Sequence, residues 1–227
     1  VLKKFSNTIY SKKSFNNKFG VPLSLFNLDK NIEYGVFEVG MDKKGEIDLL
    51  TNIIKPDIGV ITNVSYAHAK NFKNLREIAF AKAEIIQNIK EGGDLVLNAD
   101  DKFFNLHKNL AFKKNINVHS FSVKKQNSNI QLNNIKKIGN RFKLKLSINK
   151  KIKYFFVSSI FDTDIKNILA AITIISIFKD IINLDINIFY KQKPPTGRGD
   201  ISKVRVKDKS FFLIDESYNS NPLSLRS

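Results

Sequence analysis

Cysteine is absent from the sequence, which excludes disulfide bonds and cysteine-ligated metal sites. We also find neither a signal peptide nor an apolar run long enough to cross a bilayer, so we expect a cytoplasmic protein without membrane contact. Hydrophobic residues make up 42% of the 227 residues, which is ample for a buried core. The composition therefore indicates a globular chain with one large domain, or one domain and part of another.

Acidic residues are scarce relative to basic ones. The chain has 21 Asp and Glu against 38 Lys and Arg, which gives a net charge of +17. Such a charge suits nucleic-acid binding, because lysine and arginine neutralise phosphates. The lysines are nevertheless spread along the chain, and many in residues 124–153 alternate with apolar residues, as on a solvated face. We therefore keep a non-enzymatic, nucleic-acid-binding module only as a minor alternative.

The N-terminal half alternates two hydrophobic periodicities. Strand-like runs at residues 35–39, 58–64 and 94–98 are separated by helix-like segments at 46–54 and 74–89. This alternation predicts βαβ units, and so an α/β fold with a mostly parallel sheet and flanking helices.

The pattern changes from about Val118. Short alternating runs, such as residues 142–146 and 154–157, predict an antiparallel β-meander appended to the sheet. Helical spacing returns at 165–178. The prolines and glycines of residues 194–199 then predict a linker, and strand-like runs at 201–206 and 211–214 predict the opening hairpin of a further domain. We therefore expect a central domain over residues 1–196 and the beginning of a second domain over residues 197–227.

Three polar residues stand at the ends of these segments. Glu38 closes the first strand-like run, His68 follows the second, and Lys82 lies in the helix-like segment that comes next. In a parallel sheet with crossover helices such positions meet at the carboxyl edge, where open α/β folds bind ligands. The spacing therefore predicts a site that combines a carboxylate, an imidazole and an amine.

Each of the three residues also has a purely structural interpretation. Glu38 alone is equally consistent with a helix N-cap or a surface carboxylate, and His68 with a capping residue. Lys82 alone fits a solvated helix lysine paired with Glu77 or Glu84.

Four motifs, in this order along the chain, resemble the central domain of the Mur ligases. They are Glu38-Val39-Gly40-Met41, Asn63-Val64-Ser65-Tyr66-Ala67-His68, Ala81-Lys82-Ala83-Glu84 and Asn98-Ala99-Asp100-Asp101. Segments 16–23 and 215–222 extend the resemblance over nearly the whole chain. They make it most similar to the branch that adds D-alanyl-D-alanine to UDP-N-acetylmuramoyl-tripeptide.

The resemblance implies an ATP-dependent, ADP-forming peptide ligase of peptidoglycan precursor synthesis. ATP would phosphorylate the terminal carboxylate of the nucleotide-linked tripeptide, and the amine of D-alanyl-D-alanine would then displace the phosphate. Both reactants are anionic, so Mg²⁺ ions are needed to screen their charge. We expect a monomer when full length. The alternatives within this enzyme class are the Mur enzyme that adds the third residue and a folyl-polyglutamate synthase.

The resemblance also implies the metal site. Glu38 and His68 would hold a magnesium ion, and Lys82 would carry a carbamate that presents carboxylate-like oxygens in place of a cation. Magnesium prefers oxygen ligands, so the assignment of His68 rests on the family context alone.

Substrate and nucleotide contacts follow from the same resemblance. Asn16 and Asn17 would face the substrate, although their neighbourhood is also typical of a local turn. Asn167 would contact the adenine, while Thr163 stands near the place of a histidine that is usual in the family.

Three residues near the end of the sequence complete the implied ATP site. Arg198 would reach an ATP phosphate, and Asp215 and Asn219 would approach the ribose and phosphates. The structural alternative for all three is an interdomain linker followed by a capped turn.

The family's glycine-rich phosphate loop, which ends in Gly-Lys-Thr or Gly-Lys-Ser, is missing from this sequence. We expect it just upstream of Val1. The predicted fold is therefore a P-loop-type central domain without its phosphate loop, followed by the start of a C-terminal Rossmann-like domain. Such a fragment is not expected to turn over ATP on its own.

Overall fold

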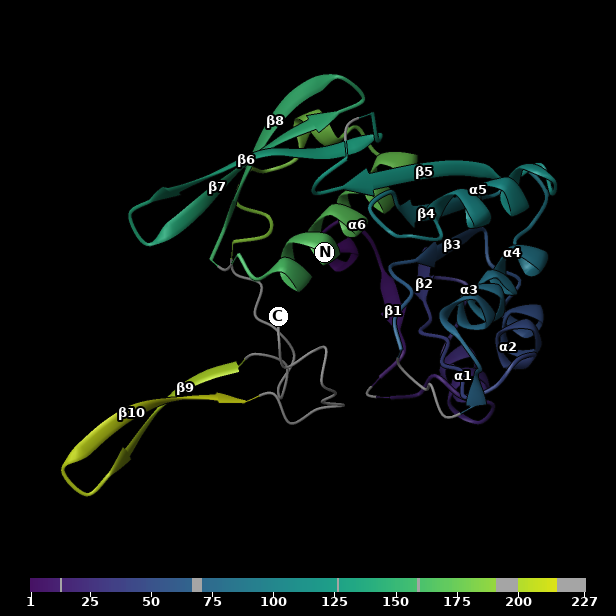
Figure 1. The fold of residues 1–227 in the computed structure, drawn as a ribbon, viewed down its shortest axis with the longest axis horizontal. Helices are drawn as coiled ribbons and strands as arrows, with labels where there is room; N and C mark the ends of the chain where they lie inside the picture. Colours follow the sequence, from purple (N-terminus) through teal and green to yellow (C-terminus); the bar gives the residue numbers. More distant parts are fainter. Residues whose placement is uncertain (13, 67–70, 126, 159, 191–199, 216–227) are drawn as a thin grey trace.

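The computed structural model describes residues 1–12, 14–66, 71–125, 127–158, 160–190 and 200–215. Six strands form one mixed sheet (Figure 1). Its strands, in spatial order, are β3 (Ile58–Ile61), β4 (Asp94–Asn98), β5 (Asn117–Ser122), β6 (Ile130–Ile138), β7 (Arg141–Ile148) and β8 (Lys151–Val157). The pairs from β3 to β6 are parallel, whereas β6, β7 and β8 are antiparallel. The predicted parallel sheet with an appended meander is confirmed, but the antiparallel part begins at β6 rather than near Val118.

Two smaller sheets accompany the main one. They are the parallel pair β1 (Thr8–Tyr10) and β2 (Tyr34–Val36), and the antiparallel hairpin β9 (Asp200–Val206) and β10 (Lys209–Asp215). The hairpin lies where the sequence predicts it. Strands β2 and β3 end earlier than their apolar runs, so residues 37–39 and 62–64 lie beyond the paired part.

Helices connect and cover these strands. They are α1 (Gly20–Leu25), α2 (Glu46–Ile54), α3 (Leu75–Ala83), α4 (Ile85–Asn88), α5 (Phe104–Phe112) and α6 (Asp162–Phe178), with short 3₁₀ turns η1 (Leu2–Lys4) and η3 (Ile181–Asn183). Helix α2 has the predicted bounds, whereas the single helix predicted over residues 74–89 is divided into α3 and α4. Within the described ranges, no helix combines the length and hydropathy that a membrane span requires.

The main sheet is buried on both faces at β4. Val96 packs into the larger hydrophobic cluster, to which α6 also contributes, while Leu95 and Leu97 pack into a second cluster with Ile86 and Ala111. Alternate residues of a strand point to opposite faces, so β4 lies between two helical layers. This three-layer arrangement fixes the strand ends from which the candidate site is built.

Candidate active site

The segments that bear the predicted site residues meet in one hydrophobic cluster. Five side chains of this cluster pack together. Val39 and Met41 follow β2, Val64 follows β3, and Ile78 and Ala81 lie on α3. Val39 adjoins Glu38 in the sequence, and Ala81 adjoins Lys82. The structure therefore brings together the segments of Glu38 and Lys82 and the residues that lead to His68. His68 itself lies outside the described residues.

Glu38 is exposed and is positioned from the segment that follows β1. The Asn16 side-chain amide donates to Glu38 Oε1 at 2.9 Å, and the Asn16 carbonyl accepts from the Gly40 N–H at 2.7 Å. A Cβ on Gly40 would approach Asn16 Cγ to 3.0 Å, so glycine allows this close contact. Helix α2 is capped by Gly45, so Glu38 is not its N-cap. No second partner holds this carboxylate within the described part of the chain, which leaves an oxygen open to a cation.

Asn17 has a local role that the turn interpretation anticipated. Its side-chain oxygen accepts hydrogen bonds from the N–H groups of Phe19 and Gly20, at 3.0 and 2.9 Å, at the start of α1. Asn16 and Asn17 thus stand side by side in the sequence with different functions, one on Glu38 and one on the helix. Substrate contact by either residue stays a prediction.

Lys82 lies on the buried side of α3, and burial lowers the pKa of its amine, an effect that the negative charge of Asp101 partly opposes. The predicted alternative partners are engaged elsewhere. Glu84 accepts from the N–H groups of Gly45 and Asp48 at 2.8 and 3.1 Å, and Glu77 accepts from the Lys73 N–H at 2.8 Å. Among the described residues, no hydrogen bond or ion pair holds the Lys82 ammonium. The interpretation of Lys82 as a solvated, ion-paired surface lysine is therefore wrong.

Two adjacent aspartates tie together the carboxyl ends of three strands. Asp101 accepts from the N–H groups of Val64 and Phe103 at 2.7 and 2.8 Å, which joins the segment after β3 to the segment after β4. Asp100 accepts from the N–H groups of Val123 and Lys125 at 2.6 and 2.9 Å, just beyond β5. We identified the motif of these aspartates from the sequence, but not these roles. The sequence feature that could have indicated these roles is a pair of carboxylates directly after a buried strand.

The loop between β2 and α2 is fixed by its own carboxylate. Glu46 accepts from the N–H groups of Asp42 and Lys43 at 2.6 and 3.1 Å, and these backbone hydrogen bonds lower the pKa of Glu46. Gly45 has φ +89°, a left-handed conformation that favours glycine. Asn71 donates to the Asp42 carbonyl at 2.9 Å. The loop after β2 is therefore held beside the segment that precedes α3.

His107 is a buried residue that the sequence interpretation missed. Its Nε2 lies 3.0 Å from the Ala79 carbonyl, and since a carbonyl only accepts, Nε2 carries the proton. Burial is the largest cause of its pKa shift and lowers the pKa, so the ring is neutral. His107 thus joins α5 to α3 and is a packing residue.

The residues predicted to contact the nucleotide are described only in part. Asn167 is exposed on α6, with Thr163 exposed one turn earlier, and α6 packs on β4, β5 and β6. Asp215 is the last residue of β10, opposite Asp200 in the hairpin register. Arg198 and Asn219 lie outside the described residues, so their predicted contacts with ATP stay predictions.

Comparison with known proteins decides the family. Residues 1–175 match the family model of the Mur ligase middle domain. The chain belongs to this family. The matched region of the Mur ligase middle domain ends within α6, before the hairpin of β9 and β10.

Two curated relatives of this Mur ligase domain bear the name UDP-N-acetylmuramoyl-tripeptide--D-alanyl-D-alanine ligase. The protein of that name from Buchnera aphidicola subsp. Baizongia pistaciae is 34% identical over 229 residues, which cover 99% of this chain and 48% of the relative. That from Rickettsia prowazekii is 30% identical over 225 residues, which cover 95% of this chain and 47% of the relative. The chain thus spans about half the length of these relatives.

Solved structures support the fold. MurF from Acinetobacter baumannii has a TM-score of 0.86 at 23% identity, over 99% of this chain and 48% of that one. A MurF ligase from Thermotoga maritima in complex with ADP has a TM-score of 0.83 at 23% identity, over 99% of this chain and 50% of that one. An FPGS mutant from L. casei has a TM-score of 0.53 and covers 64% of this chain.

The described residues of this Mur ligase domain fit a hard divalent cation only in part. No group of three or more His, Cys, Asp or Glu side chains within the described ranges is arranged to hold a metal ion. The Glu38 carboxylate supplies one open oxygen of the type that magnesium prefers. Further ligands would have to come from His68 and from a Lys82 that has been converted to an oxygen donor.

Proposed function

We propose that this chain is the ATP-binding middle part of a ligase that joins D-alanyl-D-alanine to UDP-N-acetylmuramoyl-tripeptide. The observation that carries the proposal is the hydrophobic cluster of Val39, Val64 and Ala81, which joins the Glu38, His68 and Lys82 segments in a chain whose relatives bear that ligase name. Residues 1–196 would form the central domain and residues 197–227 the beginning of the next. The proposed enzyme acts in the cytoplasm as a monomer.

Lys82 would provide a metal ligand through a covalent change. A neutral amine attacks carbon dioxide, a C–N bond forms, one C=O electron pair moves to oxygen, and the nitrogen loses a proton, which gives a carbamate. Burial lowers the pKa of the Lys82 amine, and this favours the neutral form that the step needs. Together with Glu38 and His68, the carbamate oxygens would hold Mg²⁺, which, when bound, neutralises the charge of the phosphates and the substrate carboxylate.

The ligation itself would take two steps. The terminal carboxylate of the tripeptide attacks the γ-phosphorus of ATP, and ADP leaves. The dipeptide amine then attacks the acyl phosphate, the C–O bond to phosphate breaks, and the amine loses a proton. The protein's contribution is mainly to position the reactants. Asn16 and Asn17 would contact the peptide substrate, Asn167 the adenine, and Arg198, Asp215 and Asn219 the ribose and phosphates.

Substitution of Lys82 tests the proposal. In the full-length ligase we expect Lys82→Ala to lower the ligation rate at least about 100-fold, since the metal site loses an anionic ligand, and bicarbonate is not expected to restore it. The measurement is ADP release that depends on both the tripeptide substrate and D-alanyl-D-alanine. Lys90→Ala is the control, because Lys90 is exposed and pairs with Asp57. Near-normal activity of Lys82→Ala would remove Lys82 from the mechanism.

Two alternatives receive less support. The FPGS structure has a TM-score of 0.53, against 0.86 for the A. baumannii MurF, so a folyl-polyglutamate synthase is disfavoured.

A nucleic-acid-binding module would show sub-micromolar DNA affinity at physiological salt together with a steep salt dependence. A salt titration of DNA affinity separates that module from the ligase, for which we expect only weak binding at physiological salt.

A further inference from the structure

Most of the excess positive charge comes from one continuous part of the chain. The lysines are spread along the sequence, but the acidic residues are not: residues 102–161 contain 14 Lys and Arg and no Asp or Glu. This part forms α5, β5 and the meander of β6, β7 and β8. Because it has no acidic side chains of its own, its cations are not neutralised locally, and its surface attracts anions.

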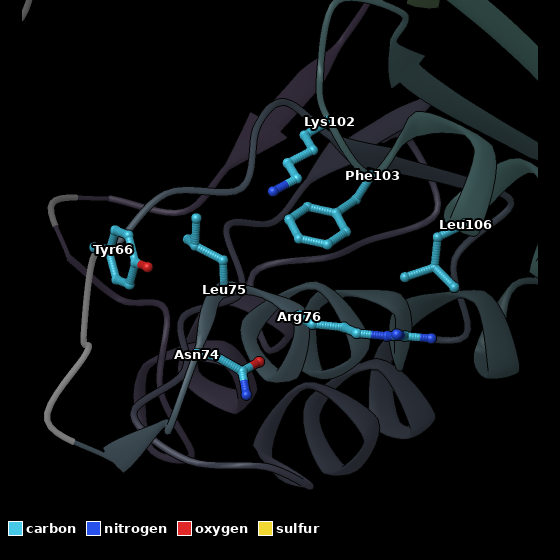
Figure 2. A pocket seen from close by; sticks show the side chains of 7 residues that line it. All are labelled: Tyr66, Asn74, Leu75, Arg76, Lys102, Phe103 and Leu106. Atoms are coloured by element: carbon cyan, nitrogen blue, oxygen red, sulfur yellow. The ribbon is translucent and has the colours of Figure 1, made fainter.

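Positive charge alone does not make a binding surface. Arg76 and Lys102 line an open depression between the ends of β3 and β4 and the start of α3, but their side chains are directed apart (Figure 2). Each lies near an aromatic ring of its own. A surface that attracts an anion by charge has to place several cations side by side.

One face of the meander has this arrangement. Along β7, Leu144 and Leu146 are buried in the larger hydrophobic cluster. Successive side chains of a strand point to opposite faces, so Arg141, Lys143 and Lys145 lie together on the other face, which we call the outer face. The cluster that covers this side of β4 includes no described residue of the meander. In Figure 1, β7 and β8 extend to the left, away from α4 and α5 on the right.

The outer face also sets like charges opposite one another. Lys136 of β6 is the register partner of Lys143 of β7, and like charges in such cross-strand pairs repel. The ion pairs found within the described ranges involve none of the four outer-face cations, which are Lys136, Arg141, Lys143 and Lys145. An anion bound on the outer face would relieve this repulsion.

Apolar side chains lie between these cations. Lys143 lies over the Tyr154 ring and Arg141 over the Phe156 ring, each 4.0 Å from the ring centroid. Ile152, two residues before Tyr154 on β8, is exposed on the same face. The two rings are covered by cations, so they are not open platforms on which nucleic-acid bases can stack. Tyrosine and aliphatic side chains beside cations suit the headgroup region of a membrane.

We propose that the outer face of the meander binds the surface of an anionic phospholipid membrane, with the four outer-face cations at the lipid phosphates and with Tyr154 and Ile152 in the headgroup layer. The contact is peripheral. Our expectation of no membrane contact rested on the lack of a spanning segment, which a surface contact does not need. The proposed membrane contact does not depend on the proposed ligase activity.

Vesicle sedimentation of the full-length protein tests the proposal. We expect binding to phosphatidylcholine vesicles that contain about 30% phosphatidylglycerol, no binding to phosphatidylcholine alone, and release at about 0.5 M NaCl. Lys143→Gln combined with Lys145→Gln should lower the partition coefficient about 25-fold, or about fivefold for each cation. Lys30→Gln combined with Lys44→Gln is the matched control, because it changes the net charge equally at exposed positions outside the meander. This control should bind as the wild type does.

Three results would overturn the proposal. They are a wild type that does not bind anionic vesicles at about 0.1 M salt, an outer-face double variant that binds them as the wild type does, and a control that loses binding to the same extent as that variant. Single-stranded RNA is titrated in parallel. RNA binding that the outer-face substitutions remove, without vesicle binding, would assign the face to nucleic acid instead. A cooperative urea transition shows that each variant is folded.

Discussion

Lys82 and His107 lie on α3 and α5, where the Lys82 side chain is partly buried and that of His107 is buried, and burial is the largest cause of the lowered pKa of each. The two residues have different roles because only one of them has a hydrogen-bond partner. His107 donates its one proton to the Ala79 carbonyl, whereas no hydrogen bond within the described residues holds Lys82. A partly buried amine that has a lowered pKa and no hydrogen-bond partner among the described residues is available for chemistry, whereas a buried imidazole with a partner is a structural crosslink.

His107 should make the fold sensitive to acid. The unfolded chain binds a proton at His107 near the ordinary pKa of 6.5, whereas the folded chain resists protonation to a lower pH. Its contribution to stability is therefore complete above about pH 6.5 and is lost as the pH falls below that value. We expect His107→Gln, which keeps an N–H donor but does not titrate, to weaken the decrease in unfolding free energy between pH 7.5 and 5. Urea titrations at several pH values measure this, and identical pH profiles would contradict it.

At the level of elements, the sequence predicts the helices and strands whose signals are local. The bounds of α2 follow from the glycine before it and from the spacing of Ile47 and Leu50, both buried. The hydrophobic periodicity of the sequence does not predict helix α5, because this helix buries only His107 and Ala111, too few residues for an apolar pattern.

Strand ends and crosslinks depend on contacts between distant residues. The apolar run of β3 continues to Val64, but the Val64 N–H donates to Asp101, 37 residues later, instead of to a neighbouring strand. The sequence predicts that the segments of Glu38, His68 and Lys82 converge, because each follows or lies near a strand end. It does not predict that Asp101 and His107 help to hold these segments together. Their partners are backbone groups, which no side-chain pattern reveals.

The crosslink between β3 and β4 should contribute to both stability and activity. Asp101→Ala leaves the N–H groups of Val64 and Phe103 without their acceptor, which we expect to lower the unfolding free energy by about 2 kcal/mol. In the full-length ligase we also expect a lower ligation rate, because Val64 begins the segment that leads to His68. Denaturant titration and ligation assays measure the two effects. An Asp101→Ala variant with the unfolding free energy of the wild type would show that this crosslink does not contribute to stability.

On the scale of the whole molecule, one core joins the parallel half of the sheet to the meander. The larger cluster contains Val96 of β4 and Phe121 of β5 together with Leu144, Leu146 and Phe155 of the meander. Helix α6 contributes Leu169 and Ile172 to the same cluster. The two halves should therefore unfold together and not as separate units.

Truncation of a central aromatic tests this cooperativity. Phe155 is fully buried and contacts Phe189 edge-to-face, with ring centroids 5.3 Å apart. We expect Phe155→Ala to lower the unfolding free energy by about 3–5 kcal/mol through the cavity that it creates. The loss should appear as a single shifted transition in both near-UV and far-UV circular dichroism. Two separate transitions, with the parallel half unchanged, would show that the meander is independent.

The most direct test of the shared metal site is a crystal structure of the full-length ligase with Mn²⁺ and a non-hydrolysable ATP analogue. Anomalous scattering locates the Mn²⁺ ions independently of the protein model. We predict an ion within about 2.3 Å of a Glu38 carboxylate oxygen, with His68 and a carbamate on Lys82 as further ligands. An unmodified Lys82, remote from every bound ion, together with a Glu38 that contacts none, would contradict the account.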